Sequence, residues 1–139
     1  MAWQIPLSDI AMGGDEVDAV RDVLQSRWLS MGPVTEEFEA AFARYLGVKH
    51  AFAVSNGTAA LHIAHAVLGI GSGDEVITPS LTFVATANSV LYCGARPVFA
   101  DIAGPDDLNV AWEDIAAKVS PRTRAITVVH YGGIPATCS

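Results

Sequence analysis

Apolar residues in the first part of the chain recur at helical spacing. Val17, Val20 and Leu24 fall on one face of a segment that spans residues 14–27. Acidic residues occupy the first turn of this segment, where the positive end of a helix dipole stabilises them. The pattern predicts an amphipathic helix.

A second helix is predicted after a polar turn at residues 30–33. Phe38, Phe42 and Tyr45 recur at helical spacing, and Gly47 supplies a residue that commonly ends a helix. We expect these aromatic side chains to pack in a core rather than to form a cage around a ligand.

From His50 onward the pattern changes to short apolar runs that alternate with helical segments. Buried parallel strands are continuous apolar runs, and each crossover between them needs a helix. The pattern therefore predicts an α/β fold with α-β-α layers around a mostly parallel sheet. Strands are expected at residues 50–54, 75–79, 96–101 and 124–129, and helices at residues 58–68, 82–93 and 111–118. We expect a single incomplete domain over residues 1–139, with leading helices over 1–47 and alternating strands and helices over 48–139.

Composition narrows the class of protein. The chain has 139 residues, 51% of them hydrophobic, and a formal net charge of -7 with no basic patch, which argues against nucleic acid or an anionic membrane as partner. The start of the chain lacks the pattern of a signal peptide, and no apolar run is long enough to span a bilayer, so we expect a cytoplasmic protein. Cys93 and Cys138 have neither disulfide-framework nor metal-ligand spacing, so we expect reduced thiols and no metal site.

The run from Val54 to Leu61 contains the first candidate site. A short apolar stretch ends in small polar residues, and a helix begins at once. Free N–H groups at the helix start, with Gly57 allowing close approach and the Thr58 hydroxyl able to donate, are suited to bind a phosphate. The alternative is that Ser55, Asn56 or Thr58 only caps the helix.

Two further loops follow strands and could flank the same crevice. Ligands of open α/β sheets bind at the carboxyl ends of the strands, where the loop at residues 80–83 and the run from His130 to Gly133 are both expected. Phe83 could stack on a planar cofactor, or could be an ordinary core residue at a helix start. His130 and Tyr131 could line a pocket. Asp101 could be catalytic, although bonding to a turn is the commoner role of a carboxylate that ends a strand.

The glycines at positions 69, 71 and 73 do not form a dinucleotide fingerprint. They follow a helix and precede a strand, which is the reverse of the order that this motif requires. We expect Gly69 to end the helix and the others to form a tight loop. An unrelated nucleotide-binding α/β domain is thus a disfavoured alternative.

Taken in order, four runs resemble the DegT/StrS family of pyridoxal-phosphate enzymes, which includes sugar-nucleotide aminotransferases of the type I aspartate-aminotransferase fold. The runs are RWLSMGPVTEEFE, AVSNGTAALH, GSGDEVITPSLTFVATANSVLYCGARPVFADI and VVHYGGIPA. The resemblance covers nearly the whole chain and implies that it is the amino-terminal part of the large domain that binds pyridoxal 5′-phosphate (PLP).

The resemblance also implies roles for individual residues. Gly57 and Thr58 would hold the cofactor phosphate, and the ring of Phe83 would stack on the pyridine. Trp28 and Ser30 would lie near the mouth of the substrate site. His130 and Tyr131 would border the cofactor crevice.

The resemblance implies transamination of a keto-sugar nucleotide with an amino-acid donor, by a homodimer. The family motifs for the Schiff-base lysine and for the aspartate that pairs with the pyridine nitrogen would lie beyond Ser139. No catalytic residue is therefore assigned within the chain; Lys49 and Lys118 are expected at the solvated surface. We expect the 139 residues alone to be inactive and to leave apolar helix faces and a sheet edge uncovered. A related sugar dehydratase and a non-catalytic remnant or interaction module are the alternatives.

Overall fold

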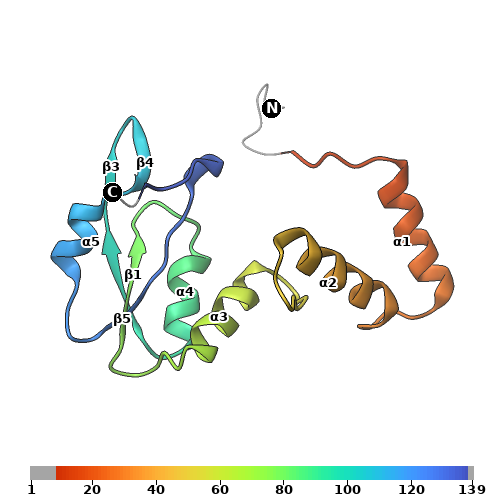
Figure 1. Ribbon diagram of the computed structural model, residues 1–139, viewed down its shortest axis with the longest axis horizontal. Coiled ribbons are helices and arrows are strands. Elements are labelled where there is room, and N and C mark those ends of the chain that lie inside the picture. The colour runs from red at the N-terminus through yellow and green to blue at the C-terminus, as the bar shows by residue number, and fades with distance from the viewer. Residues whose placement is uncertain (1–8, 138–139) are drawn as a thin grey trace, which may run out of the picture. The chain divides into compact units, whose positions relative to one another are not determined.

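The computed structural model describes residues 9–137, which fall into two compact units that divide between Ala53 and Val54 (Figure 1). Cys138 and the first eight residues, on which the absence of a signal peptide was argued, lie outside the described residues. Within residues 9–137, no helix has both the length and the apolar composition needed to cross a bilayer.

The first unit contains the two predicted helices, α1 (Gly14–Ser26) and α2 (Pro33–Leu46). Glu16 caps the start of α1 by accepting a hydrogen bond from the N–H of Gly13 at 2.7 Å. Proline at the first position of α2 starts that helix with a preset backbone angle, and Gly47 ends it in the left-handed conformation, with φ of 67°.

The aromatic side chains of α2 are not core residues of the first unit, so that expectation was wrong. Phe38 is 56% exposed and Tyr45 is 86% exposed, whereas Ala43 is the buried residue of the helix. Phe38 and Phe42 contact each other, with ring centroids 5.7 Å apart. The helical spacing was correct, but no described element of this unit covers the apolar face that it creates.

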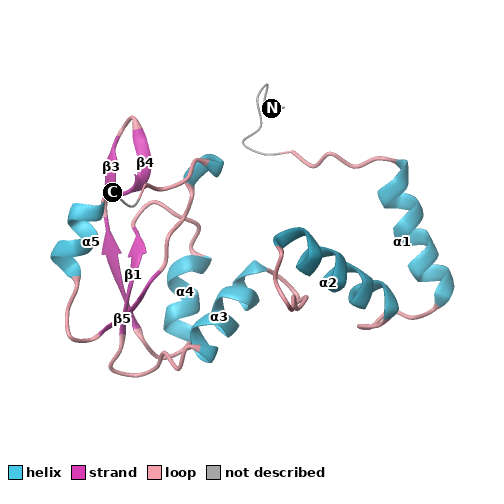
Figure 2. Cartoon of the chain, viewed as in Figure 1, coloured by secondary structure: helices cyan, strands magenta, loops and turns pink. Residues whose placement is uncertain are grey.

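The second unit is built on a parallel sheet with strand order β2-β1-β5 (Figure 2). This confirms the mostly parallel sheet of an α/β fold. The elements, in chain order, are α3 (Gly57–Val67), β1 (Glu75–Pro79), α4 (Ala85–Tyr92), β2 (Arg96–Ala100), β3 (Ile102–Gly104), β4 (Asp107–Val110), α5 (Trp112–Lys118), β5 (Thr123–Ile126) and the short 3-10 turn η1 (Tyr131–Gly133).

Successive residues of β1 build two separate cores, because side chains alternate across a strand. Val76 packs with Ile70 and Val90 on the face that α3 and α4 cover. Ile77 packs with Val110 and Ile115 on the other face, beneath α5 (Figure 1). All five residues of β1 are buried, as expected of a central strand with a helix layer on each side.

Two details of the fold differ from the sequence prediction. Residues 50–54 form no strand. The segment between residues 102 and 110 forms an antiparallel hairpin, β3–β4, that was not predicted, and its turn falls at Pro105 and Asp106.

The amino ends of the three parallel strands are joined by a buried carboxylate. Glu75, 4% exposed, accepts hydrogen bonds from Ser120 Oγ at 2.7 Å and from Arg122 Nη2 at 2.7 Å. Arg96 on β2 lies 3.6 Å from the same carboxylate. The Arg122 side chain is exposed but paired with Glu75.

Candidate functional site

The carboxyl ends of β1 and β2 are tied together by polar side chains. Ser80, directly after β1, donates from its hydroxyl to Asp101 Oδ1 at 3.1 Å. The same oxygen accepts from the N–H of Ile102 at 2.8 Å. Asp101 therefore bonds loops at the end of its strand, which is the structural role that the sequence favoured over a catalytic one.

The start of α3 leaves two backbone donors free. Asn56 caps the helix: its side-chain oxygen accepts from the N–H of Ala59 at 2.9 Å, and its carbonyl accepts from the N–H of Ala60 at 3.1 Å. Among residues 9–137, the N–H groups of Gly57 and Thr58 have no acceptor. The space where a side chain of Gly57 would begin is open, with no atom within 4 Å.

These donors fit a phosphate group. Two free N–H groups, the positive end of the helix dipole and the Thr58 hydroxyl converge on the first turn of α3. The capping alternative holds for Asn56, and it leaves the predicted seat at Gly57 and Thr58 available. An oxyanion bound here would satisfy the donors that Asn56 does not reach.

Phe83 lies in the loop between β1 and α4, and its side chain is 75% exposed. Its carbonyl accepts from the N–H of Thr86 at 3.0 Å, which fixes the backbone at the start of α4. In the described unit Phe83 is therefore not a core residue, and its ring is free to stack on a planar group.

The segment that carries His130 and Tyr131 follows β5, and two hydrogen bonds involve these two residues. Asn109 Oδ1 accepts from the N–H of Tyr131 at 3.0 Å. His130 Nδ1 accepts from the N–H of Ala136 at 3.0 Å. Because Nδ1 is an acceptor, the neutral ring carries its hydrogen on Nε2.

Polar side chains are also buried beneath α3. His65 Nε2 lies 3.4 Å from Thr127 Oγ1, just beyond the end of β5. Burial lowers the pKa of the His65 imidazole, since the charged form loses its hydration. Thr78 is fully buried, and its hydroxyl has no partner among the described residues. His65 is thus a buried side chain on the inner face of α3.

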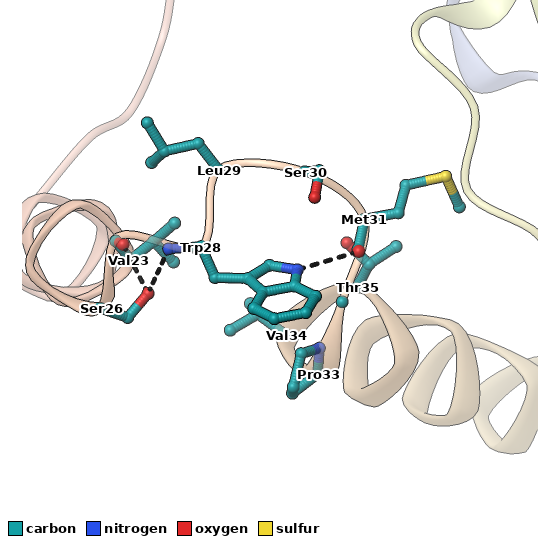
Figure 3. Close-up of a pocket in the computed structure, with 10 residues that line it drawn as sticks. Val23, Ser26, Trp28, Leu29, Ser30, Met31, Pro33, Val34 and Thr35 are labelled. Atoms are coloured by element: carbon teal, nitrogen blue, oxygen red, sulfur yellow. Dashed lines mark hydrogen bonds between the residues drawn. The ribbon is translucent and has the colours of Figure 1, made fainter.

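Trp28 and Ser30 belong to the first unit, where they line a pocket of about 500 Å³ between α1 and α2 (Figure 3). The Trp28 indole donates from Nε1 to the carbonyl of Met31 at 3.0 Å. A side chain at Gly32 would begin only 2.2 Å from that nitrogen, so glycine is required for the indole to lie against the loop. Ser30 and Met31 lie on the loop that this indole braces.

Lys118 does not lie at the carboxyl edge of the sheet. Lys118 ends α5, on the face opposite α3 and α4, and pairs with Asp114. Lys49 lies in the first unit and is exposed. No group of three or more His, Cys, Asp or Glu side chains in the described part of the chain is arranged to hold a metal ion.

Sequence reasoning missed Asn109. It is 5% exposed on β4, and the residue that it holds is 22 positions away in the chain. Nothing in the local pattern distinguishes it from an ordinary turn residue, because the hairpin on which it lies was not predicted.

Comparison with known families gives one match over most of the chain. Residues 11–139 match the DegT/DnrJ/EryC1/StrS aminotransferase family.

Solved structures agree with this match. The aminotransferase TlmJ from Streptoalloteichus hindustanus is 44% identical, with a TM-score of 0.77; the alignment covers 88% of this chain and 34% of TlmJ. The sugar aminotransferase CalS13 from Micromonospora echinospora is 39% identical, with a TM-score of 0.79, and the alignment covers 96% of this chain and 36% of CalS13. The PLP form of Spr1654 from Streptococcus pneumoniae is 30% identical, with a TM-score of 0.88 and coverages of 96% and 34%. The chain thus spans about a third of the length of these relatives.

Proposed function

The chain belongs to the DegT/DnrJ/EryC1/StrS aminotransferase family, and from this we propose that it supplies the phosphate seat and the ring-stacking side chain of a PLP-dependent sugar aminotransferase. The observation that carries the proposal is the pair of free N–H groups at Gly57 and Thr58. When bound, PLP would act as an electron sink for transfer of the amino group.

The phosphate of the cofactor would bind at the first turn of α3. The N–H groups of Gly57 and Thr58 and the Thr58 hydroxyl would donate to its oxygens. Asn56 supports this role indirectly, because its own bonds to Ala59 and Ala60 define where the helix begins.

The pyridine ring would lie against Phe83. An aromatic ring that is three-quarters exposed, on a loop at the carboxyl edge of a parallel sheet, is available for stacking on a planar ligand. His130 and Tyr131 follow β5, the strand next to β1, and we propose that they border the same crevice.

The substrate that we propose is a keto-sugar nucleotide, with an amino acid as donor of nitrogen. Support comes from the names of the relatives, since CalS13 is a sugar aminotransferase. Trp28 and Ser30 would lie near the substrate mouth, and the enzyme would be a homodimer. The cytoplasmic location remains a prediction from the sequence.

We propose further that these 139 residues alone do not turn substrate over. Lys118 is paired with Asp114 on the face of the sheet opposite α3, so it is not placed to capture the cofactor covalently, and the family resemblance assigns no such role to Lys49. The chain would bind PLP without forming a covalent bond to it.

A titration with PLP tests both the phosphate seat and the absence of a covalent bond to the cofactor. Because a hydrogen bond to a charged group contributes about 1.5–3 kcal/mol, Thr58→Val should weaken PLP binding by roughly tenfold or more, as measured by calorimetry. Pyridoxal, which lacks the phosphate, should bind weakly and equally to both chains. Treatment of the PLP complex with borohydride should leave the mass of the chain unchanged.

The matched control is Thr123→Val, which makes the same chemical change at the amino edge of the sheet. It should leave PLP affinity unchanged. An equal loss in both variants, or full affinity in Thr58→Val, would show that the phosphate binds elsewhere. A mass increase at Lys49 or Lys118 after borohydride would contradict the absence of a catalytic lysine.

A further inference from the structure

The hairpin β3–β4 lies between β2 and α5 in the chain, and one of its side chains reaches the turn after β5. Asn109 is 5% exposed, and its Oδ1 accepts from the N–H of Tyr131 at 3.0 Å. Its own backbone is fixed, since its N–H donates to Asp107 Oδ1 at 3.0 Å. The next residue, Val110, is buried and pairs with Ile102 across the hairpin.

The turn that Asn109 contacts has little other support. Gly132 and Gly133 adopt positive φ angles of 63° and 81°, with no atom within 4 Å of either Cβ position. Two backbone bonds, from Gly133 to the His130 carbonyl and from Ile134 to the Tyr131 carbonyl, close the turn on itself. Such a turn has a defined shape, but only contacts with other elements can fix its place relative to the sheet.

Two side-chain contacts involve residues of the turn, and a third holds the chain after it, where Trp112 Nε1 donates to the carbonyl of Thr137. The bond between His130 Nδ1 and the N–H of Ala136 joins residues of the same segment. The Asn109 contact joins the segment to the hairpin and, through Val110 and the Ile77 core, to the sheet. Asn109 is therefore the side chain from another element that bonds the turn itself, whereas Trp112 on α5 bonds only the chain that follows the turn.

We propose that Asn109 is a positioning residue of the cofactor site: it holds the His130–Gly133 turn at the carboxyl edge of the sheet so that the ring-bearing part of the cofactor meets a fixed surface. This inference rests on the proposed function. It assigns to the hairpin a role in the site, although no residue of the hairpin is proposed to touch the cofactor.

The test combines amide exchange with ligand binding on the complete chain. Asn109→Leu keeps the size of the side chain and removes the acceptor, whereas Asn109→Asp retains an acceptor oxygen. In the Leu variant the amide of Tyr131 should exchange roughly tenfold faster, and in the Asp variant it should remain protected. The amides of Thr127 and Ser80 bond to Ile77 and Ala100, so they serve as internal references for an intact sheet.

Binding provides the second readout. Asn109→Leu should weaken the affinity for PLP by about threefold or more. The affinity for inorganic phosphate should not change, because the phosphate seat lies on α3, which is a separate element. Asn109→Asp should bind PLP as tightly as the unsubstituted chain. Unchanged protection of Tyr131 in the Leu variant would overturn the proposal. Loss of protection without loss of PLP affinity would overturn the role in the cofactor site. Fast exchange of the Thr127 amide in the unsubstituted chain would show that the sheet is not formed as described, and this would overturn the proposal.

Failure of the proposed function gives a different result. If the unsubstituted chain binds no PLP, the cofactor assignment falls, whatever happens at position 109. The exchange rate of the Tyr131 amide in the two Asn109 variants would then still show whether Asn109 holds the turn.

Discussion

At the scale of single residues, buried polar side chains do most to connect distant parts of the sequence. Glu75 joins the amino ends of three strands, and Asn109 joins the hairpin to the turn after β5. Each bond links residues more than 20 positions apart. A buried polar group without such a partner would be costly, so these contacts help to define one arrangement of the chain.

Glu75 should make stability depend on pH. Hydrogen bonds from Ser120 and Arg122 lower the pKa of its carboxyl below the ordinary 4.5. A lowered folded-state pKa adds stability that is complete above the unfolded-state pKa and is lost as the pH falls through the folded-state value. The urea midpoint should therefore decrease as the pH falls below about 4.5, and Glu75→Gln should show a smaller decrease from a lower midpoint at neutral pH.

Glu113→Gln is the matched control, because Glu113 is exposed on α5. It should unfold like the unsubstituted chain at each pH. If Glu75→Gln keeps the full pH dependence, the acid sensitivity comes from other carboxylates.

At the scale of elements, helix ends and strand edges explain which predictions succeeded. Helices α1, α2 and α3 were predicted well because apolar spacing, proline, glycine and capping residues are local signals. The strand expected at residues 50–54 was wrong, since a strand requires a partner that no local signal identifies. The hairpin β3–β4 was missed because its strands are only three and four residues long.

The cap of α3 should be measurable separately from ligand binding. Asn56→Ala should lower the free energy of unfolding by about 1 kcal/mol, since it removes the acceptor for the Ala59 N–H. Urea unfolding without ligand is the measurement. Asn56→Asp keeps a capping oxygen and should cost little; an equal loss in both variants would show that the cap oxygen is not the source of the effect.

At the scale of the whole molecule, the main feature is that helices α1 and α2 have exposed apolar faces. Val20 and Leu24 on α1 are 61% and 59% exposed, and Phe38 on α2 is 56% exposed. Apolar patches of this kind mark surfaces that associate with other protein. We expect the chain to self-associate in solution.

Sedimentation velocity over a range of concentrations checks this. Leu24→Gln should shift the distribution toward the monomer, because it weakens the apolar face of α1 without changing net charge. Ala19→Gln, on the polar face of the same helix, should leave the distribution unchanged. A monomer at every concentration in the unsubstituted chain would contradict the expectation.

Much of this protein was determined by its sequence alone. Apolar spacing and turn residues are local, so they were sufficient for the α/β class and for most helices and strands, whereas the phosphate seat at Gly57 and Thr58 remains a prediction. The tertiary structure decided what depends on distant partners. It exposed Phe83 and the aromatic face of α2, gave residues 50–54 no strand partner, and brought Asn109 against the N–H of Tyr131. The physical reason is that burial and long-range hydrogen bonding are properties of neighbours in space, which a local pattern does not contain.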